Sequence, residues 1–119
     1  MNEKIDVEIT SQDKVAIVGF KATSISDAEA IATVSKQIKE FIDESCPENI
    51  VFDFKRVKFF SSQVLGLLLD IRAQLKKDDG QVVISAIEPR LHRVFKITNL
   101  DKVFRFFPDK ESAVQALTS

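Results

Sequence analysis

The stretch IVFDFKRVKFFSSQVLGLLL, residues 50–69, joins a β-rich apolar segment, a basic step, a pair of serines and an apolar helical run. Ile50 to Phe54 is apolar almost throughout, which is typical of a strand inside a sheet. The helical run begins directly after Ser61 and Ser62. The sequence therefore predicts a strand-to-helix turn in which the serine side chains lie near unpaired backbone N–H groups.

The serine pair is the best candidate in the chain for a regulatory switch. The N-terminal end of a helix carries partial positive charge, so a phosphoryl group added there would be stabilised. The alternative interpretation is purely structural, because serine is a preferred N-cap residue and one serine would be sufficient. Composition alone favours the cap over the switch.

Two strands and a helix are predicted before this stretch. Residues 5–9 alternate between apolar and polar, and residues 15–20 form a second strand, so the chain is expected to open with a hairpin. Ser26 and Glu29 make a capping box, with Ser26 as the N-cap of an amphipathic helix. The apolar face of that helix is Ile31, Val34, Ile38, Phe41 and Ile42.

Further helices and strands are predicted after the serine pair. The helix that follows it extends to residue 75, and Gly80 suits a left-handed turn behind it. The remaining elements are a strand over 81–87, a short helix from Pro89 to Asn99, a strand over 103–107 and a helix capped by Asp109. Strands separated by helices form parallel pairs through right-handed crossovers. We therefore expect one α/β domain over residues 1–119, with a mixed, mostly parallel sheet, an N-terminal hairpin and about four helices.

The composition excludes several classes of protein. At 119 residues, the chain is long enough to bury a core without disulfides or metals. Its net charge of -1 argues against a general nucleic-acid or membrane-surface binder, since both need a basic excess. The first residues, MNEKIDVEIT, differ from a basic-then-apolar signal peptide, and no apolar run approaches membrane-spanning length. We expect a cytoplasmic protein.

The residue types that catalysis needs are scarce. His92 is the sole histidine and Cys46 the sole cysteine, so a nucleophile–base pair, an intrachain disulfide and a cysteine-built metal site lack support. No glycine-rich phosphate loop is present, and Gly66 is expected to permit close packing of a helix on the sheet. The sequence indicates no enzyme, cofactor or metal. A nucleotide-binding domain that uses Asp53 and the helix start at Ser61 remains an alternative.

From Ile50 onward the chain resembles the STAS domain, the fold of bacterial anti-sigma factor antagonists. The family pattern is an apolar strand, a short step and then Asp-Ser-Ser/Thr-Gly-Leu-Gly at the start of a helix. The matching segments are IVFDFKRVKFFSSQVLGLLL and RVFKITNLDKVFRFFPDKESAVQAL, residues 50–69 and 93–117. The second match is fairly specific, and the predicted order of elements also matches the family from end to end.

This resemblance implies a function and a mechanism. An unphosphorylated antagonist binds an anti-sigma factor that is a serine kinase, and thereby releases the sigma factor. Phosphorylation of the serine after the motif Asp abolishes this binding, and a PP2C-type phosphatase restores it. In an ungapped match Ser61 takes the phosphoacceptor position, with Ser62 as the alternative. The expected partner-binding residues are Phe60, Ser61, Ser62, Gln63 and Val64.

The chain departs from the family pattern at the motif itself. Phe60 stands where the family has Asp, Gln63 stands where it has Gly, and Leu65 takes the place of the second Gly unless the match shifts by one residue. Loss of the Asp removes a carboxylate that could orient the serine, and the Phe-Phe pair makes the turn more apolar. An unswitched STAS interaction module or scaffold is therefore the alternative function. The sigma factor, the kinase and the oligomeric state stay open.

Overall fold

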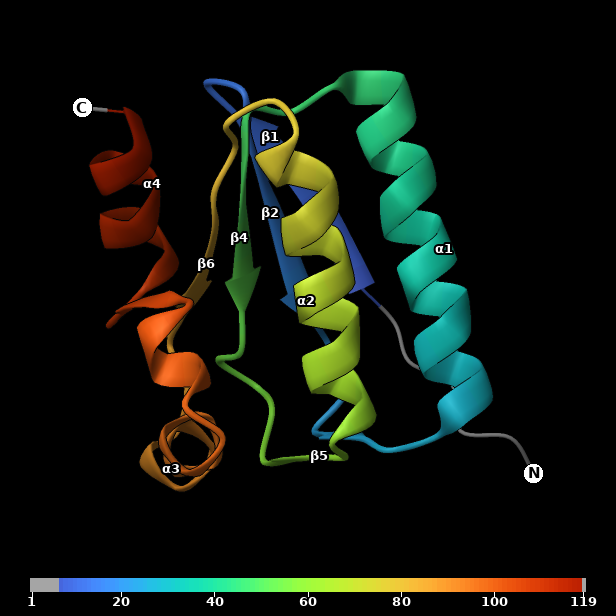
Figure 1. Cartoon of the computed structure of the whole chain (residues 1–119), viewed down its shortest axis with the longest axis vertical. Coiled ribbons are helices and arrows are strands. Elements are labelled where there is room, and N and C mark those ends of the chain that lie inside the picture. Colours follow the sequence, from blue (N-terminus) through green and yellow to red (C-terminus); the bar gives the residue numbers. More distant parts are fainter. Residues whose placement is uncertain (1–6, 119) are drawn as a thin grey trace.

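A mixed five-stranded sheet in the order β1-β2-β4-β6-β7 forms the centre of the molecule (Figure 1). The structure is a computed structural model and describes residues 7–118. The strands are β1 (Val7–Gln12), β2 (Val15–Phe20), β4 (Asn49–Asp53), β6 (Val82–Ser85) and β7 (Arg105–Phe107). β1 and β2 pair antiparallel, and all other neighbours pair in parallel. The predicted mixed sheet with an N-terminal hairpin is confirmed, although residues 5 and 6 of its expected first strand lie outside the described residues.

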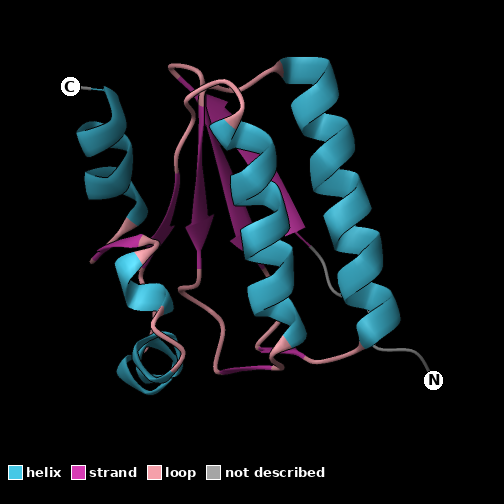
Figure 2. Cartoon of the chain, viewed as in Figure 1, coloured by secondary structure: helices cyan, strands magenta, loops and turns pink. Residues whose placement is uncertain are grey.

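Helices cover both faces of this sheet (Figure 2). Within residues 7–118 they are α1 (Ala28–Ser45), α2 (Gln63–Lys76), α3 (Pro89–Ile97) and α4 (Lys110–Thr118), with a short 3-10 helix, η1 (Leu100–Lys102). α1 and α2 lie side by side on one face, joined at the surface by an ion pair of 3.5 Å between Lys39 and Asp70. α4 packs on the other face, and α3 lies at the end of the molecule where β4 points (Figure 1).

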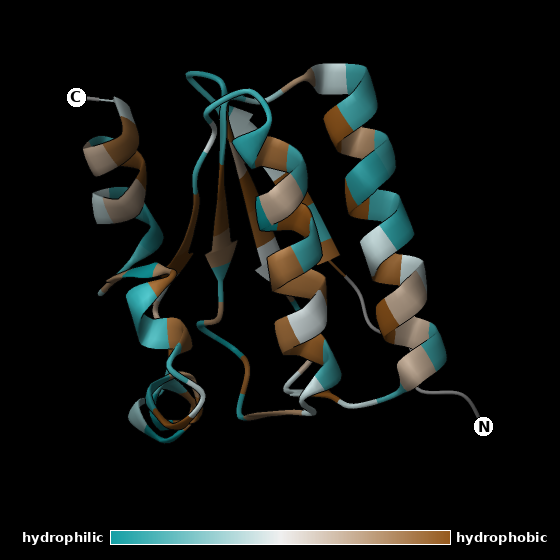
Figure 3. Ribbon diagram, in the orientation of Figure 1, coloured by the Kyte–Doolittle hydropathy of each residue, from teal (hydrophilic) through white to brown (hydrophobic). Residues whose placement is uncertain are grey.

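The apolar character of the central strand follows from these two covered faces. Side chains alternate across a strand, so Ile50 and Phe52 of β4 enter the core under α1 and α2, whereas Val51 enters the core under α4. All three side chains are completely buried. Figure 3 shows the result, with hydrophobic strands between helices whose inner stripes are also hydrophobic. This is why residues 50–54 lack the alternation of a strand with one solvated face.

The structure corrects two predicted helix ends and confirms a third. The N-cap of α1 is Asp27, whose carboxylate accepts a hydrogen bond of 3.2 Å from the backbone amide of Glu29, so the helix starts one residue later than a Ser26 cap implies. Behind α2 the left-handed residue is Asp79, with φ of 60°, and not Gly80. Asp109 caps α4 as predicted, and its hydrogen bond from the backbone amide of Ser112 holds the pKa of its carboxyl below the usual value.

The role of Gly80 is to permit a close approach between two segments of backbone. A Cβ atom added at Gly80 would overlap the carbonyl oxygen of Glu48 and would lie 3.1 Å from the carbonyl oxygen of Leu75. Both atoms belong to the backbone and cannot move away cheaply. Gly80→Ala is therefore expected to lower the free energy of unfolding by about 2 kcal/mol, as measured by urea denaturation.

Gly66→Ala is the matched control for that substitution. Gly66 is exposed near the start of α2, and a Cβ added there would meet nothing within 4 Å, so the expected packing of this glycine against the sheet is wrong. Because alanine is a better helix former than glycine, Gly66→Ala should raise the free energy of unfolding by about 1 kcal/mol. Equal effects of Gly80→Ala and Gly66→Ala on the free energy of unfolding would contradict both the close backbone approach at Gly80 and the open space at Gly66.

Candidate functional site

A two-residue strand holds the serine pair against the segment that precedes α1. β5 (Phe59–Phe60) pairs in parallel with β3 (Ser24–Ile25), separately from the main sheet. The pairing is reinforced on both sides: the amide of Lys58 donates to the carbonyl of Thr23 at 2.7 Å, and the amide of Ser61 donates to the carbonyl of Ile25 at 2.9 Å. Figure 1 places β5 and the start of α2 at the same end of the molecule as α3.

The two phenylalanines of β5 point in opposite directions, as consecutive residues of a strand must. The Phe60 side chain is only 6% exposed, and its ring centroid lies 5.9 Å from that of Phe54 and 6.0 Å from that of Phe95. Phe59 is 54% exposed. The Phe-Phe pair therefore places one ring in the core and one ring at the surface.

The five predicted partner-contact residues divide into a surface group and a core group. Ser62 and Gln63 are exposed and Ser61 is partly buried. Phe60 and Val64 are buried and can only support the contact surface from beneath. Phe59 is the exposed residue that sequence reasoning missed. The alternation of a strand was the available signal, but a strand of two residues is too short to show a period.

The two serines differ in accessibility. Ser62 is exposed and occupies the N-cap position of α2, but with φ of -60° and ψ of -19° it is already helical and its side chain makes no capping hydrogen bond. Ser61 is partly buried, and its Oγ atom is covered and has no hydrogen-bond partner within the described part of the chain. Ser62 therefore stands at the predicted N-cap position, but neither serine side chain makes the capping hydrogen bond. Ser62 presents the accessible hydroxyl.

The unpaired hydroxyl of Ser61 should destabilise the fold. A buried polar group without a hydrogen bond costs roughly 1–3 kcal/mol. Ser61→Ala removes that group while it keeps the backbone bond to Ile25, so we expect it to raise the free energy of unfolding by about 1 kcal/mol. The same substitution at exposed Ser62 should change it by less than about 0.5 kcal/mol. Urea denaturation of the two variants compares them directly, and a Ser61→Ala variant less stable than the parent would contradict the unpaired hydroxyl.

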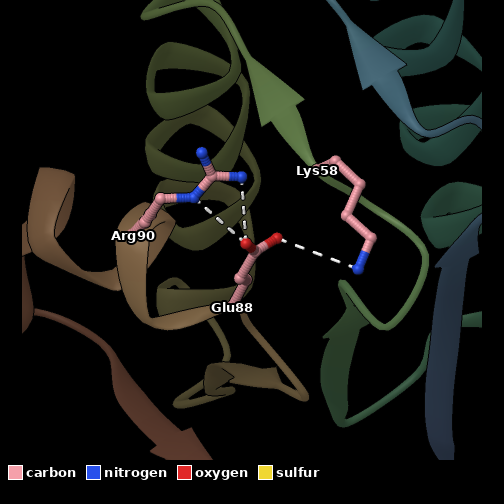
Figure 4. Close-up of polar contacts among 3 residues, drawn as sticks. All are labelled: Lys58, Glu88 and Arg90. Carbon is pink, nitrogen blue, oxygen red and sulfur yellow. Dashed lines mark hydrogen bonds and ion pairs between the residues drawn. The ribbon is translucent and has the colours of Figure 1, made fainter.

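An ion-pair cluster joins the β4–β5 loop to the start of α3 (Figure 4). Glu88 precedes α3, and its Oε1 atom accepts from the Nη2 and Nε atoms of Arg90 at 3.0 and 3.1 Å. Its Oε2 atom lies 4.0 Å from the Nζ atom of Lys58. The carboxylate is mostly buried, with 25% of its side chain exposed, whereas both cations are largely exposed. Two positive side chains from different elements are therefore held at one carboxylate, and one of them, Lys58, directly precedes Phe59 in the chain.

The other candidate residues do not gather at the serine pair. Asp53, at the end of β4, accepts a hydrogen bond of 3.1 Å from the buried hydroxyl of Ser85. It lines a polar pocket with Lys55 and Lys110, and neither serine is part of that lining. The His92 ring stacks on Phe106, with centroids 4.1 Å apart. A nucleotide site that combines Asp53 with the helix start is not assembled by this arrangement.

The described part of the chain contains neither a candidate metal site nor a candidate membrane-spanning helix. No group of three or more histidine, cysteine, aspartate or glutamate side chains within residues 7–118 could hold a metal ion. None of the helices in that range has the length and apolar character needed to cross a membrane.

Comparison with known proteins finds a family model and several relatives that match most of the chain. The STAS domain family model matches residues 6–113. An anti-sigma F factor antagonist of Paenibacillus polymyxa is 28% identical over 85 residues, which are 71% of this chain and 70% of that protein. A crystal structure of an anti-sigma factor antagonist from Mycobacterium paratuberculosis has a TM-score of 0.81 at 26% identity, with 98% of this chain and 96% of that chain covered. The Bacillus cell fate determinant SpoIIAA, solved in its phosphorylated form, has a TM-score of 0.72 at 19% identity and covers 95% and 98% of the two chains.

Proposed function

The chain belongs to the STAS domain family, and from this premise we propose that it is an anti-sigma factor antagonist. It binds an anti-sigma factor that is a serine kinase, and thereby frees the sigma factor. The observation that carries the proposal is an exposed serine, Ser62, at the first turn of α2 in a chain whose relatives bear the name of antagonists. Its contact surface is the start of α2 together with the preceding strand β5.

We propose Ser62, and not Ser61, as the phosphoacceptor. If the match to the family pattern Asp-Ser-Ser/Thr-Gly-Leu-Gly is shifted by one residue, Leu65 and Gly66 fall on its Leu-Gly. Ser61 then takes the place of the Asp, and Ser62 takes the place of the first Ser. Exposure supports the shifted match, because a kinase can reach Ser62 in the folded protein, whereas the Oγ atom of Ser61 is covered.

Phosphorylation at this position would change the contact surface without unfolding it. The phosphoryl group would add roughly -1.5 to -2 charges beside the first backbone amides of α2, where negative charge is favourable. A partner that covers Ser62 would have to desolvate that charge, so its affinity would fall. A PP2C-type phosphatase would restore the binding form. SpoIIAA, whose fold this chain shares, exists in a phosphorylated form.

A second candidate function is a STAS interaction module that is never phosphorylated. The observation that favours it is the position before Ser62, where this chain has a covered, unpaired serine hydroxyl in place of a carboxylate. Without that carboxylate, the Ser62 hydroxyl lacks a neighbour that could orient it for transfer of a phosphoryl group. Partner binding would then be constitutive.

Phosphosite mapping separates these candidates. The parent chain, Ser61→Ala and Ser62→Ala are each incubated with Mg-ATP and the purified serine-kinase anti-sigma factors of the source genome, and the products are analysed by mass spectrometry. We expect one phosphate on the parent and on Ser61→Ala, and none on Ser62→Ala. A phosphate lost only in Ser61→Ala would move the acceptor to Ser61. If none of the three proteins gains a phosphate under conditions that modify a control antagonist, the second candidate, a STAS module that is never phosphorylated, would be favoured.

A further inference from the structure

Three exposed cations are tied to the exposed ring of Phe59 by sequence and by contacts. Lys58 directly precedes Phe59 in the loop that leads from β4 into β5, and its ammonium group shares the carboxylate of Glu88 with Arg90. Arg93 is three residues from Arg90 on α3 and therefore shares one side of that helix. The other two cations of the loop, Lys55 and Arg56, line the polar pocket that contains Asp53. We call four side chains the Phe59 surface: Lys58, Phe59, Arg90 and Arg93.

Contacts beneath this surface fix its two parts relative to each other. Figure 4 shows Lys58 and Arg90 approaching the same carboxylate, Glu88, from different elements. Below them, the buried rings of Phe60 and Phe95 meet edge to face, with centroids 6.0 Å apart. The loop and α3 are thus joined both in the core and at the surface. A partner would meet a preformed surface and would lose little affinity to the ordering of loops.

Phe59 has the character of an anchor residue. It is one of three large hydrophobic side chains that are exposed among residues 7–118, and it is more than half exposed although its neighbour Phe60 is buried. Aromatic side chains and arginines are enriched at the centres of protein interfaces, where they fill pockets of the partner. A ring flanked by cations therefore fits an apolar pocket whose rim is negatively charged.

The distribution of charge selects the class of partner. The Phe59 surface and Glu88 together carry +2, so the rest of a chain whose net charge is -1 carries -3. A nucleic acid or an anionic membrane extends beyond a patch of this size, and it would be repelled by that acidic remainder. An acidic patch on a protein, matched to this surface in size, would meet only the positive part.

We propose that the Phe59 surface docks an acidic surface of the partner protein, and that the ring of Phe59 enters an apolar pocket within it. This inference rests on the proposed function and specifies the chemistry of the partner's side. It also connects the surface to the switch, because Ser62 follows Phe59 by three residues. A phosphate at Ser62 lowers the positive charge of this region and repels the acidic partner.

Charge reversal tests the proposal against a matched control. Lys58→Glu and Arg93→Glu are compared with Lys77→Glu, which makes the same change in net charge at an exposed lysine at the opposite end of α2. Phe59→Ser probes the apolar part of the contact. Each variant and the parent are titrated by calorimetry with the purified serine-kinase anti-sigma factors of the source genome, at about 50 and about 300 mM salt.

We expect Lys58→Glu and Arg93→Glu each to weaken the affinity roughly tenfold or more at low salt, with a smaller loss at high salt. Phe59→Ser should weaken it roughly tenfold or more at both salt concentrations, and Lys77→Glu should bind like the parent. Equal affinities of Lys58→Glu and Lys77→Glu would overturn the docking surface but leave the proposed function intact. No binding of the parent to any of these kinases would overturn both. Binding of the parent to duplex DNA or to anionic vesicles, lost in Lys58→Glu, would assign the surface to a polyanion instead.

Discussion

Replacing Phe95 with alanine should lower the free energy of unfolding by about 4 kcal/mol, because truncation of a buried phenylalanine removes its burial and leaves a cavity. Phe95 is completely buried, and its ring contacts three others: Phe60, Phe104 and Phe106, with centroids 5.2 to 6.1 Å away. These rings belong to different elements, β5, α3, β7 and the segment between α3 and β7. The cavity would therefore loosen the support beneath the candidate contact surface as well as the core.

Phe59→Ala is the control for this prediction, since it makes the same chemical change at a phenylalanine that is more than half exposed. Its effect on the free energy of unfolding should stay below about 1 kcal/mol. Urea denaturation gives both values, and if Phe95→Ala does not fold, Phe95→Leu should still lower the midpoint clearly. Similar losses at the two positions would mean that Phe95 does not hold the α3 end of the molecule together.

The order of helices and strands could be predicted from local patterns alone. Residues 15–20 and 50–53 carry the apolar and β-branched side chains of buried strands, and α1 repeats its apolar residues at helical spacing. Such patterns persist over many residues, so an error of one residue at the end of an element does not change the predicted type or order of the elements. Helix ends depend on single hydrogen bonds instead. Asp27 and Ser26 are adjacent and equally good caps, and the capping-box spacing from Ser26 to Glu29 favoured the wrong one of the two.

At the candidate site, too, local patterns could predict the position of the turn but not the exposure of its side chains. The turn at the serine pair could be located, because a strand pattern ends and a helix pattern begins there. Which of its side chains face the solvent could not be predicted, because this depends on the pairing of β5 with β3, two segments more than 30 residues apart. That pairing turns Phe60 and the hydroxyl of Ser61 inward and leaves Phe59 and Ser62 outside. The family match alone favoured Ser61 for the same reason, since it contains no information on burial.

The cationic neighbourhood of the site comes from two distant parts of the sequence. Arg90 and Arg93 belong to a basic helix, and Lys58 belongs to the basic step before the serine pair. Glu88 is the residue that joins these two parts, because its carboxylate holds Lys58 and Arg90 together from two elements. An exposed ion pair adds little stability. Its consequence here is that a cation of α3, Arg90, is held at the same carboxylate as Lys58, the residue before Phe59.

Ser62→Glu should weaken binding of the serine-kinase anti-sigma factor roughly 100-fold, or about 2.7 kcal/mol. The carboxylate places a negative charge at the centre of the contact surface, where an acidic partner meets it with repulsion and the charge loses its hydration. Ser62→Gln is nearly the same shape without the charge, so its loss should stay below about fivefold. This difference in affinity should not come from a loss of stability. Ser62 is exposed, and an acidic residue at the first turn of α2 is favourable. Ser62→Glu should therefore be as stable as Ser62→Gln or slightly more stable. Calorimetry gives the partner affinity of each variant, and urea denaturation gives its free energy of unfolding. A Ser62→Glu variant that binds as tightly as Ser62→Gln would show that charge at this position does not control the interaction.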